Sequence, residues 1–97
     1  MAVNDKQKRY LKGLAHDLKP IVMIGNKGLT DTVQAEIDNA LSHHELIKVK
    51  ISGADKTDKI AMAEAIAKHQ QADLIMMIGH IAAFYRPAEK PTLQLPR

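Results

Sequence analysis

The sequence contains no cysteine and no tryptophan, and its only aromatic residues are Tyr10, Phe84 and Tyr85. Without cysteine the chain has no disulfide framework, no thiolate nucleophile and no zinc site built on Cys ligands. No apolar run approaches the roughly 18 residues that a membrane-spanning helix needs. The charged start, MAVNDKQKRY, lacks the apolar core of a secretory signal. We therefore expect a soluble, cytoplasmic protein whose core is mainly aliphatic.

The chain has 97 residues, which is the size of one small domain. It shows no internal repeat, no low-complexity segment and no linker. Its last segment, AEKPTLQLPR, contains two prolines and no periodic apolar pattern. We expect residues 1–87 to form the domain and residues 88–97 to form an extended or partly disordered tail.

Positive charge is concentrated at the two ends of the chain. Residues 1–29 contain six Lys and Arg against two Asp, whereas residues 30–73 contain five Lys against eight acids. Residues 74–97 contain three basic residues against one acid, and the net charge is +3. This distribution favours a polyanionic partner.

Three segments have the apolar spacing of amphipathic helices. The first, over 5–18, ends before Pro20 because the residue before a proline is forced out of the helical region. The second begins after Thr30, a good N-cap residue, and ends near His43. The third is capped by Asp55 or a neighbouring residue. The side chains expected to face inward are Leu11, Leu14, Ala15 and Leu18 in the first helix, Val33, Ile37, Ala40 and Leu41 in the second, and Ile60, Met62, Ala63, Ile66 and Ala67 in the third.

Four segments predict β-strands, at 21–24, 45–51, 74–78 and 81–85. The second alternates between apolar residues and lysines, which is typical of a strand with one buried and one wetter face. The third is an uninterrupted apolar run, which predicts a central strand. Turns are expected at Ser52-Gly53 and at Gly79-His80.

The predicted order is α-β-α-β-α-β-β, an α/β fold. Helical connections between strands form right-handed crossovers, so the first three strands should be mostly parallel. The fourth strand follows a two-residue turn and should pair antiparallel with the third. We expect a single mixed four-stranded sheet with helices packed against it.

The segment IVMIGNKGLT, at 21–30, places Gly25-Asn26-Lys27-Gly28 between a strand and a helix. Glycine permits positive φ and lets a phosphate approach the backbone closely. The helix N-terminus supplies free N–H groups, and Lys27 adds a full positive charge. The RNA-binding KH module clamps a nucleic-acid backbone with a GxxG loop of this kind. The segment therefore favours a phosphodiester clamp, although the same tetrapeptide is also common as a plain turn.

Several other sites are not indicated. The loop lacks the Gly-Lys-Ser/Thr of a Walker loop and the third glycine of a dinucleotide fingerprint. The pair His43-His44 does not suggest a metal site, because adjacent helical residues do not share a face. No Ser-His-Asp or paired-carboxylate pattern stands out. We expect no metal, no cofactor and no enzymatic activity.

Four segments together resemble a known family: LKGLAHDLKPIVMIGNKGLT at 11–30, VQAEIDNAL at 33–41, HELIKVKI at 44–51 and IGHIAAFYRP at 78–87. They are similar to the CRM domain, an RNA-splicing and ribosome-maturation module, in its stand-alone bacterial form, the YhbY-like proteins. The resemblance covers roughly residues 4–87. It implies a fold similar to the C-terminal domain of bacterial initiation factor three. It also implies RNA binding and association with precursors of the large ribosomal subunit.

We therefore expect an RNA-binding protein that associates with ribosomal RNA and pre-ribosomal particles and aids assembly of the large subunit. Phosphate contacts should dominate, because so few aromatic residues cannot support broad base stacking. The strand at 81–85 ends in a tyrosine that could stack on a base, followed by an arginine that could hold a phosphate. The predicted RNA-binding residues are Lys8, Arg9, Lys12, Lys19, Gly25, Asn26, Lys27, Gly28, Lys48, Lys50, Tyr85 and Arg86.

Other interpretations stay open. The segment Gly25-Asn26-Lys27-Gly28, which we call the glycine loop, could hold a small molecule or a nucleotide phosphate. Such a site would require a closed pocket with convergent acids or histidines. The chain could instead be a protein-interaction adaptor that docks through its sheet face or its tail. Lys48 and Lys50 could serve only to keep an open sheet face soluble. Tyr85 could pack at the sheet edge without contacting RNA, beside a solvated Arg86.

Overall fold

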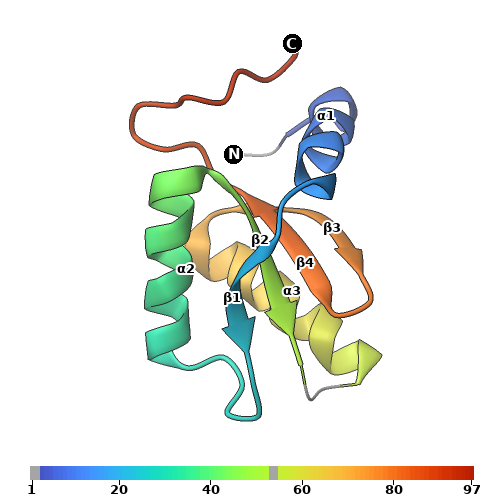
Figure 1. Cartoon of the computed structure of the whole chain (residues 1–97), viewed down its shortest axis with the longest axis vertical. Helices are drawn as coiled ribbons and strands as arrows, with labels where there is room; N and C mark the ends of the chain where they lie inside the picture. Colours follow the sequence, from blue (N-terminus) through green and yellow to red (C-terminus); the bar gives the residue numbers. More distant parts are fainter. Residues whose placement is uncertain (1–2, 53–54) are drawn as a thin grey trace.

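Helices and strands alternate along the chain in the predicted order. The computed structural model describes residues 3–52 and 55–97. The elements are α1 (Asp5–His16), β1 (Pro20–Ile24), α2 (Asp31–His44), β2 (Leu46–Ile51), α3 (Lys56–Gln70), β3 (Asp73–Ile78) and β4 (Ile81–Tyr85) (Figure 1). The α/β class and the mixed four-stranded sheet are therefore confirmed. The turn expected at Ser52-Gly53 includes Gly53, which lies outside the described residues.

The four strands lie in the order β1-β2-β4-β3. β1 and β2 are parallel, and β4 is antiparallel to both β2 and β3. The first three strands thus share one direction, as predicted, but the last strand of the chain is inserted between β2 and β3. The prediction that 74–78 is a central strand was wrong. β3 lies at an edge, and its run is apolar because Ile75 packs on the α1 side while Leu74 and Met77 pack on the other.

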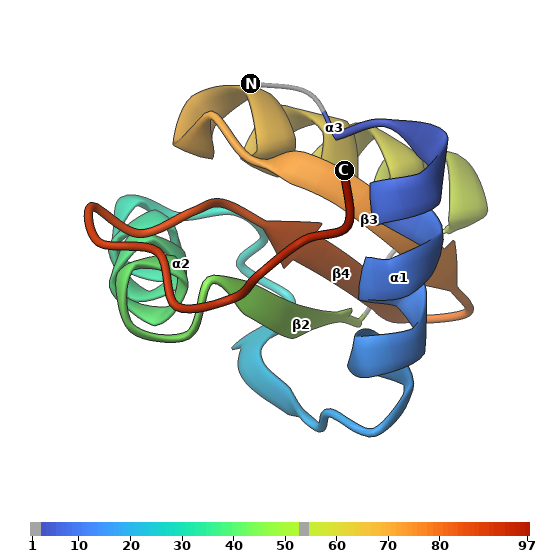
Figure 2. The same ribbon diagram turned by 90° about the horizontal axis from the view of Figure 1, so that it is seen from above.

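The sheet is covered on both faces (Figure 2). α2 and α3 pack on one face around a core that includes Ile37, Ile66 and Phe84. α1 packs on the other face through Leu11 and Ala15, against a smaller cluster. The strand residues in that smaller cluster are Leu46, Ile75, Ala83 and Tyr85.

α2 and α3 begin after the caps that the sequence predicts, and α1 begins at Asp5 as expected from its apolar spacing. Asn4 and Gln7 form a reciprocal capping box at α1, and Thr30 and Asp55 cap α2 and α3. Two apolar positions differ from expectation. Leu18 lies beyond the end of α1 and is 38% exposed, and Ile60 is 39% exposed because α3 buries only a narrow stripe.

Residues 88–97 contain neither helix nor strand. They fold back over the α1 side of the molecule, where Leu93 and Leu95 pack against the smaller cluster (Figure 2). Glu45, which we expected at the start of a strand, instead caps the C-terminus of α2 with φ 65°. Its buried carboxylate accepts hydrogen bonds from Ala88, Thr92 and Leu93, which anchors the tail.

Candidate nucleic-acid interface

The glycine loop is a tight turn between β1 and α2. The Gly28 N–H donates to the Gly25 carbonyl oxygen at 3.0 Å, and Gly28 has φ +72°. A side chain at Gly28 would therefore be strained, whereas a Cβ at Gly25 would meet nothing within 4 Å. Asn26 and Lys27, at the tip of the turn, are exposed. The loop thus presents the positive charge of Lys27 to solvent.

The start of α2 adds donors and one acid to this site. The Thr30 hydroxyl accepts from the Val33 N–H at 3.2 Å, so the cap already uses one of the free N–H groups of the first turn. Asp31, in the first turn, is exposed and carries a negative charge next to the loop. The helix dipole would therefore stabilise an anion bound at this helix end, and repulsion from Asp31 would offset part of that stabilisation.

The basic residues of α1 lie beside the edge strand β3. Lys8 and Lys12 are one helical turn apart and line a cleft of about 400 Å³ along residues 74–78. Arg9 is exposed on the same helix. These three side chains are available to a ligand that runs along the α1 side of the sheet.

Lys48 has a structural contact. Its Nζ donates to the Leu18 carbonyl oxygen at 3.0 Å and lies 3.4 Å from the His16 carbonyl oxygen. It therefore stabilises the C-terminal end of α1, where a cation favours the helix dipole. Lys50, two residues along the same strand, is exposed on the same face of the sheet. Lys19 is also exposed, just before β1.

The structure corrects the expectation for Tyr85. Because β4 is a central strand, this ring is packed in the cluster beneath α1 and is 3% exposed. Burial raises the pKa of the Tyr85 hydroxyl, and the nearby carboxylates of Glu45 and Asp73 raise it further. A buried ring of this kind presents no face on which a base could stack.

The guanidinium of Arg86 is likewise occupied by protein acceptors. It forms an ion pair with Asp38 at 2.9 Å and donates to the Ser42 hydroxyl at 3.0 Å. It also donates to the backbone and side-chain oxygens of Gln70, each at 3.2 Å. Gln70 in turn donates to Gln34 on α2. Arg86 therefore ties α2 and α3 to the end of β4 and is not a solvated phosphate ligand.

Most of the predicted residues thus fall into three groups. Gly25, Asn26, Lys27 and Gly28 lie at the carboxyl end of β1, Lys8, Arg9 and Lys12 lie on α1, and Lys19 and Lys50 are exposed just before β1 and on β2. Figure 1 shows α1 at one end of the molecule and the glycine loop at the other. Lys48 flanks this surface but is held by α1, Tyr85 is buried, and Arg86 is half-buried and held by protein acceptors.

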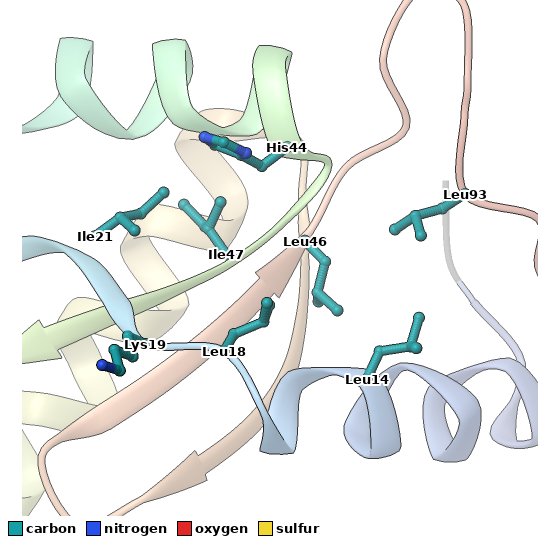
Figure 3. Close-up of a pocket in the computed structure, with 8 residues that line it drawn as sticks. All are labelled: Leu14, Leu18, Lys19, Ile21, His44, Leu46, Ile47 and Leu93. Atoms are coloured by element: carbon teal, nitrogen blue, oxygen red, sulfur yellow. The ribbon is translucent and has the colours of Figure 1, made fainter.

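A separate apolar groove of about 430 Å³ lies at the start of β1. Figure 3 shows Leu14 from α1 and Leu93 from the tail pointing toward one another across it. The other residues that line it are Leu18, Lys19, Ile21, His44, Leu46 and Ile47. Among the residues that the structure describes, no acid lines this groove, which lies at the opposite end of β1 from the glycine loop.

Residues 3–52 and 55–97 lack the features of a metal site and of a membrane span. This part of the chain contains no group of three or more His, Cys, Asp or Glu side chains arranged to hold a metal ion. The rings of His43 and His44 are 6.5 Å apart, and His43 Nδ1 lies 2.8 Å from the Asn39 carbonyl oxygen. None of its helices is long and apolar enough to cross a membrane.

The chain is similar to several known proteins over nearly its whole length. An RNA-binding protein of Haemophilus influenzae is 54% identical over 95 residues, which cover 98% of this chain and 96% of that protein. A protein of Pseudomonas aeruginosa, named a probable RNA-binding protein, is 39% identical over 95 residues, with 98% and 91% covered. The solution structure of a hypothetical protein from Staphylococcus aureus has a TM-score of 0.87 at 34% identity, covering 98% of this chain and all of that one.

The family model for the CRS1/YhbY (CRM) domain matches residues 3–86, nearly the whole of the chain. This agrees with the resemblance noted in the sequence and with the fold and relatives described above. The chain therefore belongs to the CRS1/YhbY (CRM) domain family.

Proposed function

We propose that this chain is a non-enzymatic RNA-binding protein that associates with ribosomal RNA in precursors of the large subunit and aids their assembly. Such a target places the protein in the cytoplasm. The family and the names of the relatives support RNA binding. The structural observation that carries the proposal is the exposed Asn26-Lys27 tip of the glycine loop, which lies at the N-terminus of α2.

The loop would hold the RNA backbone through charge and backbone donors. The Gly28 N–H closes the turn, and the N–H groups of Asn26 and Lys27 at its tip would donate to a phosphate. Lys27 supplies the charge, and the dipole of α2 adds a partial positive charge. Lys8, Arg9, Lys12 and Lys19 would hold further phosphates and set the orientation of the RNA.

The salt dependence of RNA binding tests this mode. Each phosphate neutralised contributes about 0.7 to 0.9 to the slope of log affinity against log salt. Four or five contacts give a slope of roughly −3 to −4.5. An affinity that does not change with salt would rule out a backbone clamp.

The RNA target is tested in cells. Crosslinking of the protein to RNA, followed by sequencing of the bound fragments, should recover large-subunit ribosomal RNA and its precursors. Recovery of messenger or transfer RNA alone would reject the ribosomal part of the proposal while leaving RNA binding intact.

The apolar groove at the start of β1 favours one alternative, a protein-interaction adaptor. Leu14, Leu18 and Ile21 line this groove, and Ile21 is 51% exposed. Binding driven by apolar contact would be insensitive to salt, unlike the phosphate contacts above. Salt-resistant binding to a protein partner, lost on changing Ile21 to Ser, would support the adaptor.

A further inference from the structure

Four residues form a row across the sheet, one from each strand. Met23 is in register with Lys50, Lys50 with Ile81, and Ile81 with Ile78. Residues paired in this way have side chains on the same face of a sheet. The neighbours Val22, Ile24, Val49 and Ile51 are buried in the core on the opposite face, so the row faces the α1 side. We call these four residues the open row.

The apolar members of the open row are unusually exposed for residues on sheet strands. Met23 and Ile78 are each 67% exposed, and Ile81 is half-buried. None of the three belongs to either core cluster of the described residues. α1 covers the next part of this face, over Ile75 and Ala83, and the open row lies beyond it. Single exposed apolar residues are ordinary, but three in one register form a surface.

Positive charge borders the row at both ends. Met23 comes two residues before Gly25, so this end leads into the turn that carries Lys27. Ile78, at the other end, lines the same cleft as Lys8 and Lys12. Lys50 lies within the row itself. Asp73 is the sole acid in the strands, all of which the structure describes, and it pairs with Tyr85 at the far end of β3.

We propose that the open row is a binding surface for the unpaired bases of single-stranded RNA. This inference rests on the proposed function and names the form of RNA that the site accepts. The RNA backbone would pass from the glycine loop to the cleft beside α1, with phosphates at Lys27 and at Lys8 and Lys12. The bases between these contacts lie on Met23, Ile81 and Ile78, and Lys50 donates to a base or phosphate oxygen.

The dimensions of the sheet suit this path. Three inter-strand spacings separate β1 from β3 in the order β1-β2-β4-β3, which is about 14 Å. RNA-recognition domains stack about two or three bases on a four-stranded sheet. Those domains use aromatic side chains, whereas here aliphatic side chains would cover the base faces. A fully paired duplex keeps its bases stacked inside and cannot make this contact.

The test compares a short single-stranded RNA with the same strand annealed to its complement. The wild-type protein should bind the single strand more tightly. Met23→Thr with Ile78→Thr removes apolar area but keeps β-branched residues that favour strands. This double variant should weaken binding of the single strand by about tenfold, since apolar contact is lost. Its affinity for the duplex and the slope of its salt dependence should not change, because no phosphate contact is removed.

Ile60→Thr is the matched control, since Ile60 is exposed on α3 on the other side of the sheet. It should bind both RNAs as the wild type does. Equal affinity of the wild type for duplex and single strand would overturn the open row while leaving the proposed function standing. A double variant that binds the single strand normally would also overturn it and would assign the row to a protein partner or to no partner. Failure of the wild type to bind either RNA would reject the proposed function itself.

Discussion

The carboxylate of Glu45 accepts a 2.6 Å hydrogen bond from the hydroxyl of Thr92, across 47 residues of chain. The same oxygen, Oε1, accepts from the backbone N–H groups of Thr92 and Leu93, and Oε2 accepts from that of Ala88. Burial alone raises the pKa of Glu45, but these hydrogen bonds outweigh it and lower the pKa to about 2. A buried charge at the end of α2 thus holds the tail in place.

Glu45→Gln should destabilise the protein by about 1 to 3 kcal/mol at neutral pH. The substituted amide group cannot accept from the N–H of Ala88, and the charge-assisted bonds become neutral ones. Because the folded-state pKa is below the ordinary value of 4.5, the stabilisation is present above that pH. The gap in free energy of unfolding between wild type and variant should shrink as the pH falls from 4.5 toward 2. Denaturant titrations across this range measure it, and a gap independent of pH would contradict a charged Glu45.

Replacing Lys8, Arg9 and Lys12 together with Gln should weaken RNA binding and spare the fold. These side chains flank the buried stripe of Leu11 and Ala15 and do not belong to it. The loss of three phosphate contacts should flatten the salt slope by roughly 2 to 2.7. Lys68→Gln on α3 is the control for Lys12→Gln, because each variant removes one positive charge. A difference in RNA affinity between the two therefore reflects the position of the charge. If the triple variant binds RNA normally, the basic face of α1 is only a solvated surface.

Asn26→Asp with Lys27→Asp should abolish or greatly weaken RNA binding without unfolding the domain. Both residues are exposed, and surface changes usually alter stability by under about 0.5 kcal/mol. The two acids would repel phosphate from the site, while the dipole of α2 tolerates them. Melting temperature and RNA affinity are measured on the same sample. A variant with wild-type values for both would show that the loop is a turn and not a clamp.

The two loop glycines should behave differently. Gly28→Ala forces a side chain into positive φ and should cost about 1 kcal/mol of stability. Gly25→Ala adds a methyl group in open space and should leave the melting temperature unchanged. If a phosphate approaches the backbone at Gly25, this second variant should nevertheless bind RNA less tightly. Equal melting temperatures for the two variants would contradict the strain assigned to Gly28.

Local pattern was sufficient to locate the elements, because caps and periodicity depend on neighbouring residues. Asn4, Thr30 and Asp55 define the helix starts through side chains that reach only three residues along the chain. The order of the strands depends on distant residues and is not contained in such patterns. The apolar run at 74–78 suggested a central strand, although β3 lies at an edge between two covered faces.

The candidate site was predicted only in part, because sequence patterns report contacts between neighbouring residues and not between distant ones. Asn26 and Lys27 lie at a turn and are exposed, as turn residues usually are. Arg86 looked free because its acceptors lie far along the chain, 16 residues away on Gln70 and more than 40 residues away on Asp38 and Ser42. Met23 and Ile78 were missed because apolar strand residues suggest burial. Only the register of the four strands shows that these side chains share the part of the α1 side of the sheet that α1 leaves open.

The insertion of β4 between β2 and β3 has a consequence for synthesis of the protein. Until residues 81–85 have left the ribosome, β1 and β2 have only each other, and β3 has no strand beside it. A two-stranded pair is marginal in water, and early segments would expose unpaired edges. Both core clusters also need residues of β4, namely Phe84 for one and Ala83 for the other. Folding of the sheet is therefore delayed until residues 81–85 have been synthesised, and a nascent chain that stops before Ile81 has no finished sheet.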